Sequence, residues 1–355
     1  MSANPDFWQG RRVLLTGHTG FKGAWAARWL TRLGAQVTGF ALAPETTPSL
    51  HDLAASDATS IIGDIRDRAA VSAAVRTSQP EIVLHLAAQP LVRRSYREPA
   101  DTFATNVMGT VNLLDALREE QDLRAVLIVT TDKVYENDEA GRAFDEADRL
   151  GGHDPYAASK AASELAVVSF ARSYFDAKGI PVATARGGNV IGGGDWSEDR
   201  LIPDIIRAAQ AGEPLNLRNP GATRPWQHVL DCLDGYLTFA EALATTNGAP
   251  RALNIGPHDP ADTQTVAQVA AAMHAALGYE SEWNLDTAPH PHEMAALALN
   301  PEAALRHLGW EGRLTSTQAI RLTADWYAAW ANGGDMATAT DAQIADYQAG
   351  QETTL

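Results

Sequence analysis

The chain of 355 residues is 45% hydrophobic and 20% charged, and it carries a formal net charge of -16 at pH 7. This length suits one large α/β domain with a smaller one, and the strong negative charge argues against binding to nucleic acid or anionic membranes. Its single cysteine, Cys232, is expected to be a free buried thiol; with no signal-peptide pattern and no apolar run long enough to cross a bilayer, a cytoplasmic protein is expected.

The first half of the chain alternates short apolar runs with helical patterns. Residues 12–16 indicate a buried strand that ends in glycines, and residues 24–33 indicate a helix that ends at Gly34. Further strands are predicted at 35–40, 60–64, 81–86, 125–130 and 181–186, with long helices at 101–119 and 156–176. Strands that alternate with helices imply right-handed crossovers, so we predict an α/β fold around a doubly wound parallel sheet.

The composition changes after Arg186. Glycine, proline and tryptophan cluster from Gly187 to Trp226, and helical patterns dominate the sequence that follows. We therefore predict a first domain over residues 1–186 and a smaller, mainly substrate-binding C-terminal domain over residues 187–355. Residues 253–256 are expected to return to the main sheet, and the tail from Ala331 is polar and weakly patterned.

A glycine-rich loop at residues 16–23 lies between the first strand and the first helix, with glycines at Gly17, Gly20 and Gly23. Glycines at this spacing permit a tight turn and let backbone N–H groups approach a pyrophosphate at the helix N-terminus. At the first crossover of a doubly wound sheet, the pattern predicts a Rossmann-like dinucleotide site. A glycine turn needed only for packing is the alternative.

The acidic residue that usually ends the second strand and binds the adenosine ribose is absent. The sequence from Gly39 to Pro44 contains no carboxylate, so it does not discriminate NAD from NADP and permits loose cofactor binding. Asp64 and Ile65, after the third strand, are candidates for contact with adenine. A capping role explains the position of Asp64 equally well.

Tyr156 and Lys160 are four residues apart, so they share one face of the second long helix. A free tyrosine has a pKa near ~10, and a nearby ammonium together with the positive charge of a cofactor would lower it. Thr131 ends the fifth strand, where parallel sheets place their sites. These three residues are predicted to take a proton from a substrate alcohol while a dinucleotide takes its hydride; an ordinary exposed helix face is the alternative.

Asp132 and Lys133 follow Thr131 directly and suggest a second reaction. If a sugar C4 hydroxyl is oxidised to a ketone, the C5 proton becomes acidic, and a base can remove it while an acid protonates the departing C6 hydroxyl. Asp132 is the candidate acid and Lys133 the candidate base, which requires Lys133 to be neutral for part of the time. The alternative is a surface Asp–Lys pair in a loop.

Together these motifs resemble those of the extended short-chain dehydrogenase/reductases, the family of NAD-dependent sugar-nucleotide epimerases and dehydratases. The resemblance covers most of the chain, and Asp-Lys after the hydroxyl residue looks like the CDP-glucose 4,6-dehydratase branch. It also extends over Phe7-Trp8-Gln9-Gly10, Pro48-Ser49-Leu50, Gly63-Asp64-Ile65-Arg66-Asp67, residues 87–93, 105–110 and 187–196, Arg224-Pro225-Trp226-Gln227-His228-Val229 and Pro291-His292-Glu293.

The resemblance implies a hydro-lyase that converts CDP-D-glucose to CDP-4-keto-6-deoxy-D-glucose. By the same resemblance, Thr131, Tyr156 and Lys160 oxidise C4, Asp132 and Lys133 carry out the elimination, and the stored hydride returns to C6. The family uses NAD, regenerated in each turnover, although it too lacks the acidic residue after the second strand. The predicted cofactor-binding residues are Gly17, His18, Thr19, Gly20, Phe21, Lys22, Gly23, Asp64, Ile65, Ala87, Ala88, Gln89, Tyr156 and Lys160.

Residues for the nucleotide sugar are also implied by the resemblance. Asn189 is similar to a residue that contacts the sugar diphosphate, and Arg224 to an arginine whose planar donors bind the nucleotide phosphates. Further candidates, each of which could instead be structural, are Arg93, Ser95, Arg200 and His292. No metal site is expected. By resemblance, the two long helices pack against a second copy in a homodimer, with a tetramer as the alternative.

The sequence departs from the family pattern between Tyr135 and Tyr156. Residues 136–150 are polar and lack the tryptophan typical of the family, and Gly151-Gly152-His153-Asp154-Pro155 follows. Because this loop lies beside the expected active site, the alternative function is a dehydratase or 4-epimerase acting on another nucleotide-hexose. A regulator that only senses the dinucleotide would usually have lost Tyr156 or Lys160, and both are present.

Overall fold

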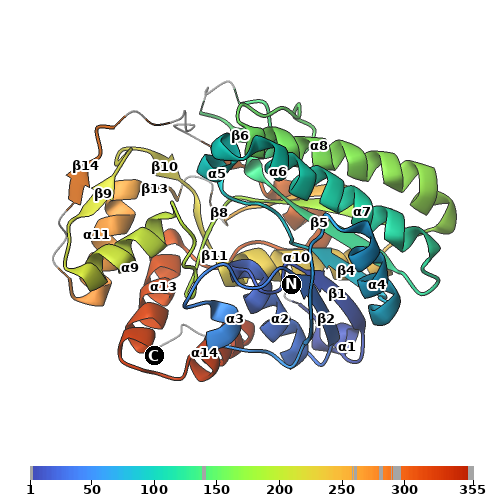
Figure 1. Ribbon diagram of the computed structural model, residues 1–355, viewed down its shortest axis with the longest axis horizontal. Coiled ribbons are helices and arrows are strands. Elements are labelled where there is room, and N and C mark those ends of the chain that lie inside the picture. Colours follow the sequence, from blue (N-terminus) through green and yellow to red (C-terminus); the bar gives the residue numbers. More distant parts are fainter. Residues whose placement is uncertain are drawn as a thin grey trace.

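The computed structural model describes residues 3–137, 141–257, 259, 262–279, 283–288, 290 and 297–350 (Figure 1). Its centre is a seven-stranded parallel sheet in the order β12-β7-β5-β4-β1-β2-β3. Every predicted strand is confirmed to within two residues, including the return of residues 253–256 to the sheet. The strands are β1 (Arg12–Thr16), β2 (Gln36–Ala41), β3 (Thr59–Ile62), β4 (Ile82–His85), β5 (Ala125–Thr131), β7 (Val182–Gly187) and β12 (Ala252–Ile255).

The order of the strands reverses beside β1. From β1 the chain moves outward through β2 and β3, and it then crosses to β4 and continues outward through β5, β7 and β12. The residues of β4 and β5 are all buried, because helices cover both faces of the sheet. In a parallel sheet such a reversal opens a crevice at the carboxyl ends of neighbouring strands, which is where ligands bind.

Two helical layers enclose the sheet. The first contains α4 (Arg68–Ser78), α7 (Gly109–Ala116) and α8 (Pro155–Phe170), and the second contains α2 (Phe21–Arg32), α10 (Val229–Thr245) and α14 (Met336–Ala349) (Figure 1). Side chains of β1 alternate between the layers: Leu14 joins the core of the first, whereas Val13 and Leu15 join the core of the second. α2 begins at Phe21, three residues before its predicted start, because Gly20 already serves as its N-cap.

The two predicted long helices are confirmed as continuous helical runs. The first extends from α6 (Pro99–Phe103) through a π-helical turn at Ala104–Met108 and α7 to a 3₁₀ turn at Leu117–Glu119. The second continues α8 through a π-helical turn at Ala171–Phe175 to Asp176–Lys178. Proline suits the first position of a helix, and the Asp154 side chain accepts the Ala157 N–H to cap α8. This cap fixes where the candidate residue Tyr156 emerges.

Most residues after β7 form a smaller region beside the carboxyl ends of the strands (Figure 1, left). Its helices are α9 (Leu201–Ala211), α11 (Val266–Leu277) and α13 (Ser316–Ala331). Its short strands pair as β8 (Asn189–Ile191) with β11 (Trp226–His228), β9 (Leu215–Leu217) with β14 (Trp283–Leu285), and β10 (Thr223–Arg224) with β13 (Gln264–Thr265). α10 and β12 return to the main sheet. The exact domain boundary stays a prediction.

The remaining short elements are α1 (Pro5–Trp8), α3 (Leu50–Leu53), α5 (Val92–Arg97), the 3₁₀ turn at Asp132–Val134, β6 (Ala143–Phe144), β15 (Ala298–Leu299) and α12 (Glu302–Leu308). The weakly patterned tail contains α14, which the sequence did not indicate. It packs through buried polar contacts, such as Thr340 Oγ1 accepting from Trp326 Nε1 at 3.0 Å, so its apolar pattern is weak. In the part of the chain that the structure describes, no helix is long and apolar enough to cross a membrane.

Candidate active site

A cleft of about 1440 Å³ follows the carboxyl ends of the central strands. One side is formed by the glycine-rich loop and the segments after β2, β3 and β4, and the other by residues 187–226 of the smaller region. Thr131, Tyr156 and Lys160 line the cleft between these two sides. The cleft therefore lies at the reversal of strand order, where this fold binds its ligands.

The glycine-rich loop has a shape that a dinucleotide fits. Gly17 adopts a φ of +80°, and a Cβ there would lie 2.7 Å from the Ala87 backbone nitrogen. A Cβ on Gly23 would overlap the Gly17 carbonyl oxygen, so α2 packs closely on the loop. Gly20 caps α2 without a side chain and lines the cleft, which leaves the helix N-terminus accessible to a phosphate. Thr19, Phe21 and Lys22 also line the cleft.

His18 differs from the prediction that it binds the cofactor. Its side chain is 1% exposed and packs where Gly39 of β2 has no Cβ, and its Nε2 lies 2.7 Å from Ser60 Oγ. Burial, with a contribution from His51, lowers the pKa of His18 to about 4. His18 is therefore a neutral packing residue behind the loop and does not line the cleft.

Asp64 and Ile65 line the cleft beyond β3. Both Asp64 oxygens accept hydrogen bonds from the Arg66 guanidinium, at 2.7 and 2.9 Å from Oδ2, and this pairing lowers the pKa of Asp64. Asp64 is not the N-cap of α4, which is Asp67, but its Oδ1 accepts the Arg66 backbone N–H at 2.8 Å and so caps the turn before that helix. Asp64 can meet a cofactor only as part of this ion pair.

Ala87, Ala88 and Gln89 line the cleft after β4, as expected. The Gln89 side chain is used internally: Nε2 donates to the Leu91 carbonyl and to Thr102 Oγ1, while Oε1 accepts from the Leu91 N–H at 2.7 Å. Gln89 therefore shapes the backbone of this cleft wall.

Thr131, Asp132 and Lys133 lie together at the carboxyl end of β5 and line the cleft. Thr131 Oγ1 donates to Asp132 Oδ1 at 2.9 Å, and Lys133 Nζ lies 3.5 Å from the same oxygen. Asp132 is 1% exposed, so the pair is not a surface loop pair. Asp132 Oδ2 is buried without a hydrogen-bond partner among the described residues, which suits an oxygen that carries a proton or meets a ligand.

Tyr156 and Lys160 are both buried on the face of α8 that borders the cleft, so they are not an exposed helix face. Thr131 lies close enough to the Tyr156 phenol to lower its pKa, and Lys160 Nζ donates to the Val129 carbonyl at 3.1 Å. Burial raises the pKa of Tyr156 to about 12, although Thr131 and the Arg200 charge oppose this rise. The protein by itself therefore does not provide the lowered tyrosine pKa that the sequence suggested.

Lys160 shows the opposite shift. Burial and then the nearby Lys22 charge lower the pKa of Lys160 to about 7, and Glu164 opposes them. Glu164 is one helical turn after Lys160 on α8. The side chain of Lys160 therefore sits between a cation and an anion, and its charge near neutral pH depends on both.

A buried ion pair between Glu164 and Arg186 supports this cluster, and the sequence analysis missed it. Their side chains are 3% and 5% exposed. Arg186 Nε donates to Glu164 Oε1 at 2.8 Å, and Thr130 Oγ1 donates to the same oxygen at 2.7 Å. The pair therefore ties α8 to β5 and β7. A charged residue ending the apolar run at 181–186, and an acid eight residues after Tyr156, were the available signals.

The same pair anchors the loop that departs from the family pattern. Arg186 Nη1 donates to Tyr135 Oη at 2.8 Å and to the Glu146 carbonyl at 3.1 Å. The Tyr135 ring stacks on Phe144, with centroids 4.9 Å apart. Residues 138–140 of the loop lie outside the described residues. The loop is thereby coupled to the helix that carries Tyr156 and Lys160.

Under the strand ends, α10 places Tyr236 and Cys232 against Gly187. A Cβ on Gly187 would overlap the Tyr236 hydroxyl, and it would lie 3.6 Å from the Cys232 sulfur. Lys22 Nζ lies 5.8 Å from the centroid of the Tyr236 ring. Cys232 is a free, fully buried thiol, as predicted, and burial raises its pKa.

The predicted substrate residues divide into two groups. Those that line the cleft are Arg93, Asn189, Arg200 and Arg224. Ser95 does not line it: its hydroxyl donates to the Val92 carbonyl at 2.6 Å and accepts from the Tyr156 N–H at 3.1 Å. Ser95 therefore holds the start of α8. The prediction that its side chain faces the substrate is wrong. His292 lies outside the described residues.

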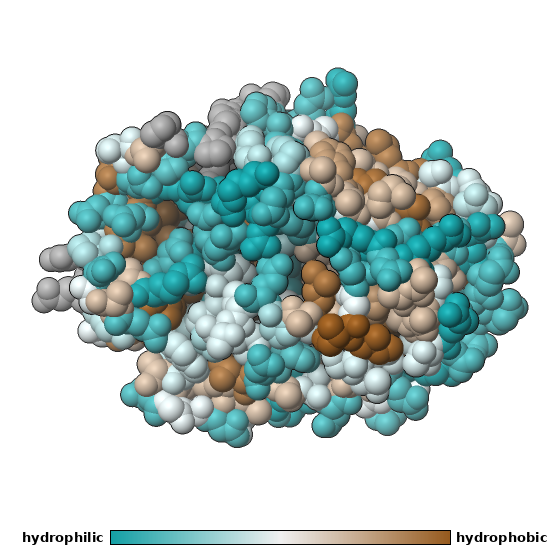
Figure 2. Space-filling model, in the orientation of Figure 1, coloured by the Kyte–Doolittle hydropathy of each residue, from teal (hydrophilic) through white to brown (hydrophobic). Residues whose placement is uncertain are grey.

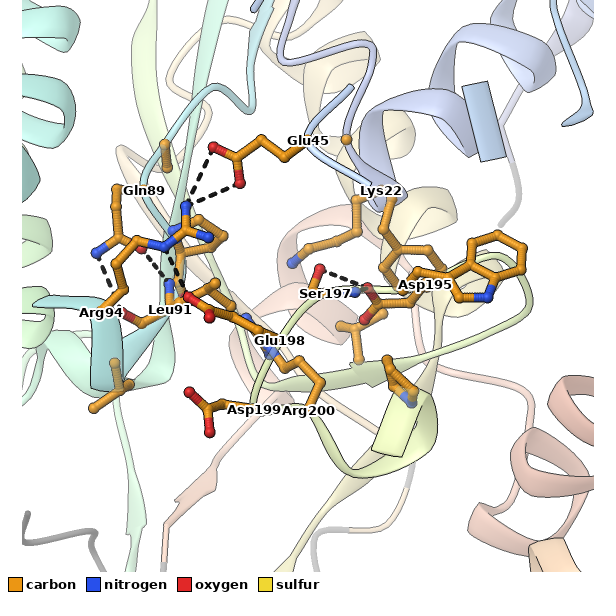
Figure 3. A pocket seen from close by; sticks show the side chains of 18 of the residues that line it. Lys22, Glu45, Gln89, Leu91, Arg94, Asp195, Ser197, Glu198, Asp199 and Arg200 are labelled. Carbon is orange, nitrogen blue, oxygen red and sulfur yellow. Dashed lines mark hydrogen bonds and ion pairs between the residues drawn. The ribbon is translucent and has the colours of Figure 1, made fainter. Parts of the chain in front are cut away.

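A network of charges crosses the cleft and was not predicted (Figure 3). Arg94 of α5 lies between two carboxylates: its Nη1 is 2.9 Å from Glu45 Oε2, and its Nε is 2.9 Å from Glu198 Oε1. Glu45 follows β2, and Glu198 belongs to the loop that precedes α9. The acidic residue nearest the end of β2 is thus paired with an arginine rather than placed for a ribose.

Residues 13–256 match the family model described as the NAD dependent epimerase/dehydratase family. The chain is 43% identical to the CDP-glucose 4,6-dehydratase of Salmonella typhimurium, over 96% of this chain and 97% of that protein. It is 33% identical to a dTDP-glucose 4,6-dehydratase of Xanthomonas campestris, over 75% of this chain and 77% of the relative. The structure of a UDP-glucose 4-epimerase from Thermus thermophilus with NAD matches with a TM-score of 0.76 at 28% identity, over 88% of this chain and 98% of that one.

Proposed function

The chain belongs to the NAD dependent epimerase/dehydratase family, and from this premise we propose that it converts CDP-D-glucose to CDP-4-keto-6-deoxy-D-glucose with loss of one water. The observation that carries the proposal is the 43% identity, over 96% of the chain, to a CDP-glucose 4,6-dehydratase. The Asp132–Lys133 pair adds support, because elimination needs an acid and a base that a 4-epimerase does not.

The cofactor is NAD. When bound, it supplies reversible redox chemistry that oxidises C4 at the start of the cycle and reduces C6 at its end, so the enzyme is a lyase. The chain residues that would hold it are Gly17, Thr19, Gly20, Phe21, Lys22, Gly23, Asp64, Ile65, Ala87, Ala88 and Lys160, all of which line the cleft.

Oxidation of C4 requires a base for the hydroxyl proton, and we assign this role to Tyr156. Thr131 lies near its phenol and donates to Asp132 at 2.9 Å. A proton taken from C4 by Tyr156 can therefore pass through the Thr131 hydroxyl to Asp132. Lys160, four residues along the same helix face, stabilises the tyrosinate when its ammonium turns from the Val129 carbonyl toward the phenol.

Elimination follows at C5 and C6. Lys133 takes the C5 proton, the C6–O bond breaks, and Asp132 gives its proton to the departing oxygen, which leaves as water. C5 then regains a proton from Lys133 as C6 is reduced. The proton lost from the C4 hydroxyl thus leaves in the water, and the Tyr156–Thr131–Asp132 chain balances the cycle.

The nucleotide sugar is proposed to occupy the side of the cleft formed by residues 187–226. Asn189 and Arg224 would contact the phosphates, and Arg200 lies close enough to Tyr156 to influence its pKa. His292, outside the described residues, stays a prediction. The free buried thiol of Cys232 suits a reducing compartment, which supports a cytoplasmic location.

We also propose a homodimer that packs the two long helical runs against their copies. Apolar side chains gather over α7 and α8 (Figure 2, upper right). Met108, Leu165, Val168 and Tyr174 on these runs are 51%, 64%, 37% and 40% exposed. A large apolar patch on one face suits an isologous contact, in which the same surface contributes from both subunits.

The test is to incubate the purified protein with CDP-glucose, with and without added NAD, and to follow the product mass. UDP-, dTDP- and GDP-hexoses run in parallel. Loss of one water from CDP-glucose alone supports the reaction and the nucleotide together. The Lys133→Ala variant separates the alternative: a 4-epimerase keeps its activity, whereas a dehydratase stops after C4 oxidation. No dehydration of any substrate would overturn the roles given to Asp132 and Lys133.

A further inference from the structure

Three arginines from both sides of the cleft converge on the carboxylate of Asp199. Arg218 Nη1 lies 3.0 Å from Oδ1, Arg93 Nη1 lies 3.6 Å from Oδ1, and Arg97 Nη1 lies 3.8 Å from Oδ2. Arg93 and Arg97 belong to α5 beside the main sheet, whereas Arg218 directly follows β9 in the smaller region. Asp199 therefore links the two walls of the cleft.

The contacts of Asp199 are those of a carboxylate that sits in an open anion-binding site. They are not those of a buried ion pair with short hydrogen bonds. The side chains of Arg93, Arg218 and Asp199 are 26%, 25% and 27% exposed, and all three line the cleft. The contacts to Arg93 and Arg97 are longer than hydrogen bonds. Of the three arginines, only Arg218 lies within hydrogen-bonding distance of Asp199, and Arg97 makes its closer contact with Glu198 at 2.8 Å.

The backbone conformation of Asp199 supports the same interpretation. Its φ is +57°, in the left-handed region that non-glycine residues seldom adopt, although Asp tolerates it better than most. Among the described non-glycine residues, only Gln79, at the end of a helix, shares a positive φ. Strain of this kind collects in segments that rearrange with a ligand.

We propose that Arg93 and Arg218 join Asn189 and Arg224 in binding the diphosphate of the nucleotide sugar, and that Asp199 occupies the site of the two arginines until the substrate displaces it. This inference rests on the proposed function, which brings a nucleoside diphosphate into the cleft. A diphosphate offers more charge and more acceptor oxygens than one carboxylate, and planar guanidinium groups bind such oxygens in pairs.

The position of the site agrees with the chemistry. Arg200, the next residue, acts electrostatically on Tyr156, so Asp199 lies beside the place of the reacting sugar. The loop stays attached when Asp199 leaves, because Glu198 is held by Arg94 at 2.9 Å (Figure 3) and also by Arg97 at 2.8 Å. Displacement of Asp199 therefore frees the arginines without releasing the loop.

Two substitutions at this contact separate a placeholder from a structural ion pair. Asp199→Asn keeps a residue that tolerates the left-handed backbone and removes the competing charge, so CDP should bind the NAD-loaded protein about tenfold more tightly. Arg218→Gln removes a ligand of the diphosphate and should weaken CDP binding by roughly 10- to 100-fold. Glu45→Gln removes the same charge from the cleft wall through its pair with Arg94, without touching Arg93 or Arg218, and should change CDP affinity less than about twofold.

Calorimetric titration with CDP, UDP and cytidine measures these effects, and urea unfolding checks that each variant is folded. Opposite signs for Asp199→Asn and Arg218→Gln, with cytidine affinity unchanged by Asp199→Asn, support the proposal. If both variants weaken CDP binding alike, the pair is structural and the proposal is wrong. If Arg218→Gln does not fold, Arg93→Gln replaces it with the same expected sign. If the same pattern appears with UDP while CDP does not bind, the proposed CDP-sugar substrate is wrong and the diphosphate site is still supported.

Discussion

Replacing Glu164 by Gln removes the negative charge that balances the buried Arg186. The two side chains are 3% and 5% exposed, so solvent cannot replace the lost pairing. Breaking a buried pair by removing one partner typically costs about 3–5 kcal/mol, because the other charge is left uncompensated. Gln keeps the shape and one acceptor oxygen, so we expect the lower end, about 3 kcal/mol. For a chain of this length, that loss lowers the melting temperature by about 4 °C.

Urea unfolding followed by tryptophan fluorescence measures this loss. The control is Asp176→Asn, which also breaks an Arg–carboxylate pair, since both Asp176 oxygens lie 2.8 Å from Arg251 Nη2. These side chains are 36% and 49% exposed, so the control should lose less than about 1 kcal/mol. A loss in Glu164→Gln no larger than in the control would refute the reasoning from burial.

Glu164→Gln also has a catalytic readout. Glu164 opposes the effects of burial and Lys22 on Lys160, whose pKa is about 7, so removing its charge lowers that pKa further. Lys160 then loses its proton at a lower pH. The alkaline limb of the kcat/KM profile, which reports the free enzyme, should therefore move to lower pH. A purely structural role for Glu164 would reduce the amount of active enzyme without moving this limb.

Three other outcomes are expected. Gly23→Ala places a Cβ on the Gly17 carbonyl oxygen and should weaken NAD binding at least ~100-fold by fluorescence titration, whereas unchanged binding would mean that the loop is not the cofactor site. Burial lowers the pKa of His85 and of His228 to about 3. Below the unfolded pKa of about 6.5, the unfolded chain therefore binds more protons than the folded one, so the protein loses stability as the pH falls. At about pH 5 each histidine costs about 2 kcal/mol of unfolding free energy. Equal unfolding free energies at about pH 5 and about pH 7 would contradict this. Leu165→Asp should convert the dimer to monomers, as measured by light scattering. If the unsubstituted protein is already monomeric, the dimer proposal is wrong.

Local patterns predicted the framework well because their causes are local. The apolar runs of β1, β4, β5 and β7 and the glycines of residues 16–23 each depend on a few neighbouring residues. Pairs distant in the sequence were missed. Arg94 meets Glu45 and Glu198 only after the two regions of the fold come together. No spacing in the sequence brings those three residues to one place.

Other differences arose where a side chain had a nearer partner than the predicted one. Ser95 sits between two candidate residues in the sequence, yet its hydroxyl is consumed by the Val92 carbonyl and the Tyr156 N–H. His18 lies inside the dinucleotide motif, but the absence of a side chain at Gly39 draws its ring into the core. Motif membership therefore placed the segment correctly and left the direction of each side chain to packing.

The lone cysteine has a practical consequence. Cys232 is sealed between α10 and the end of β7, directly beneath the candidate catalytic residues, and the chain has no other thiol. An alkylating reagent can reach it only when these two elements separate. The rate of labelling therefore reports how often α10 separates from the end of β7. A ligand that holds these two elements together should slow the labelling.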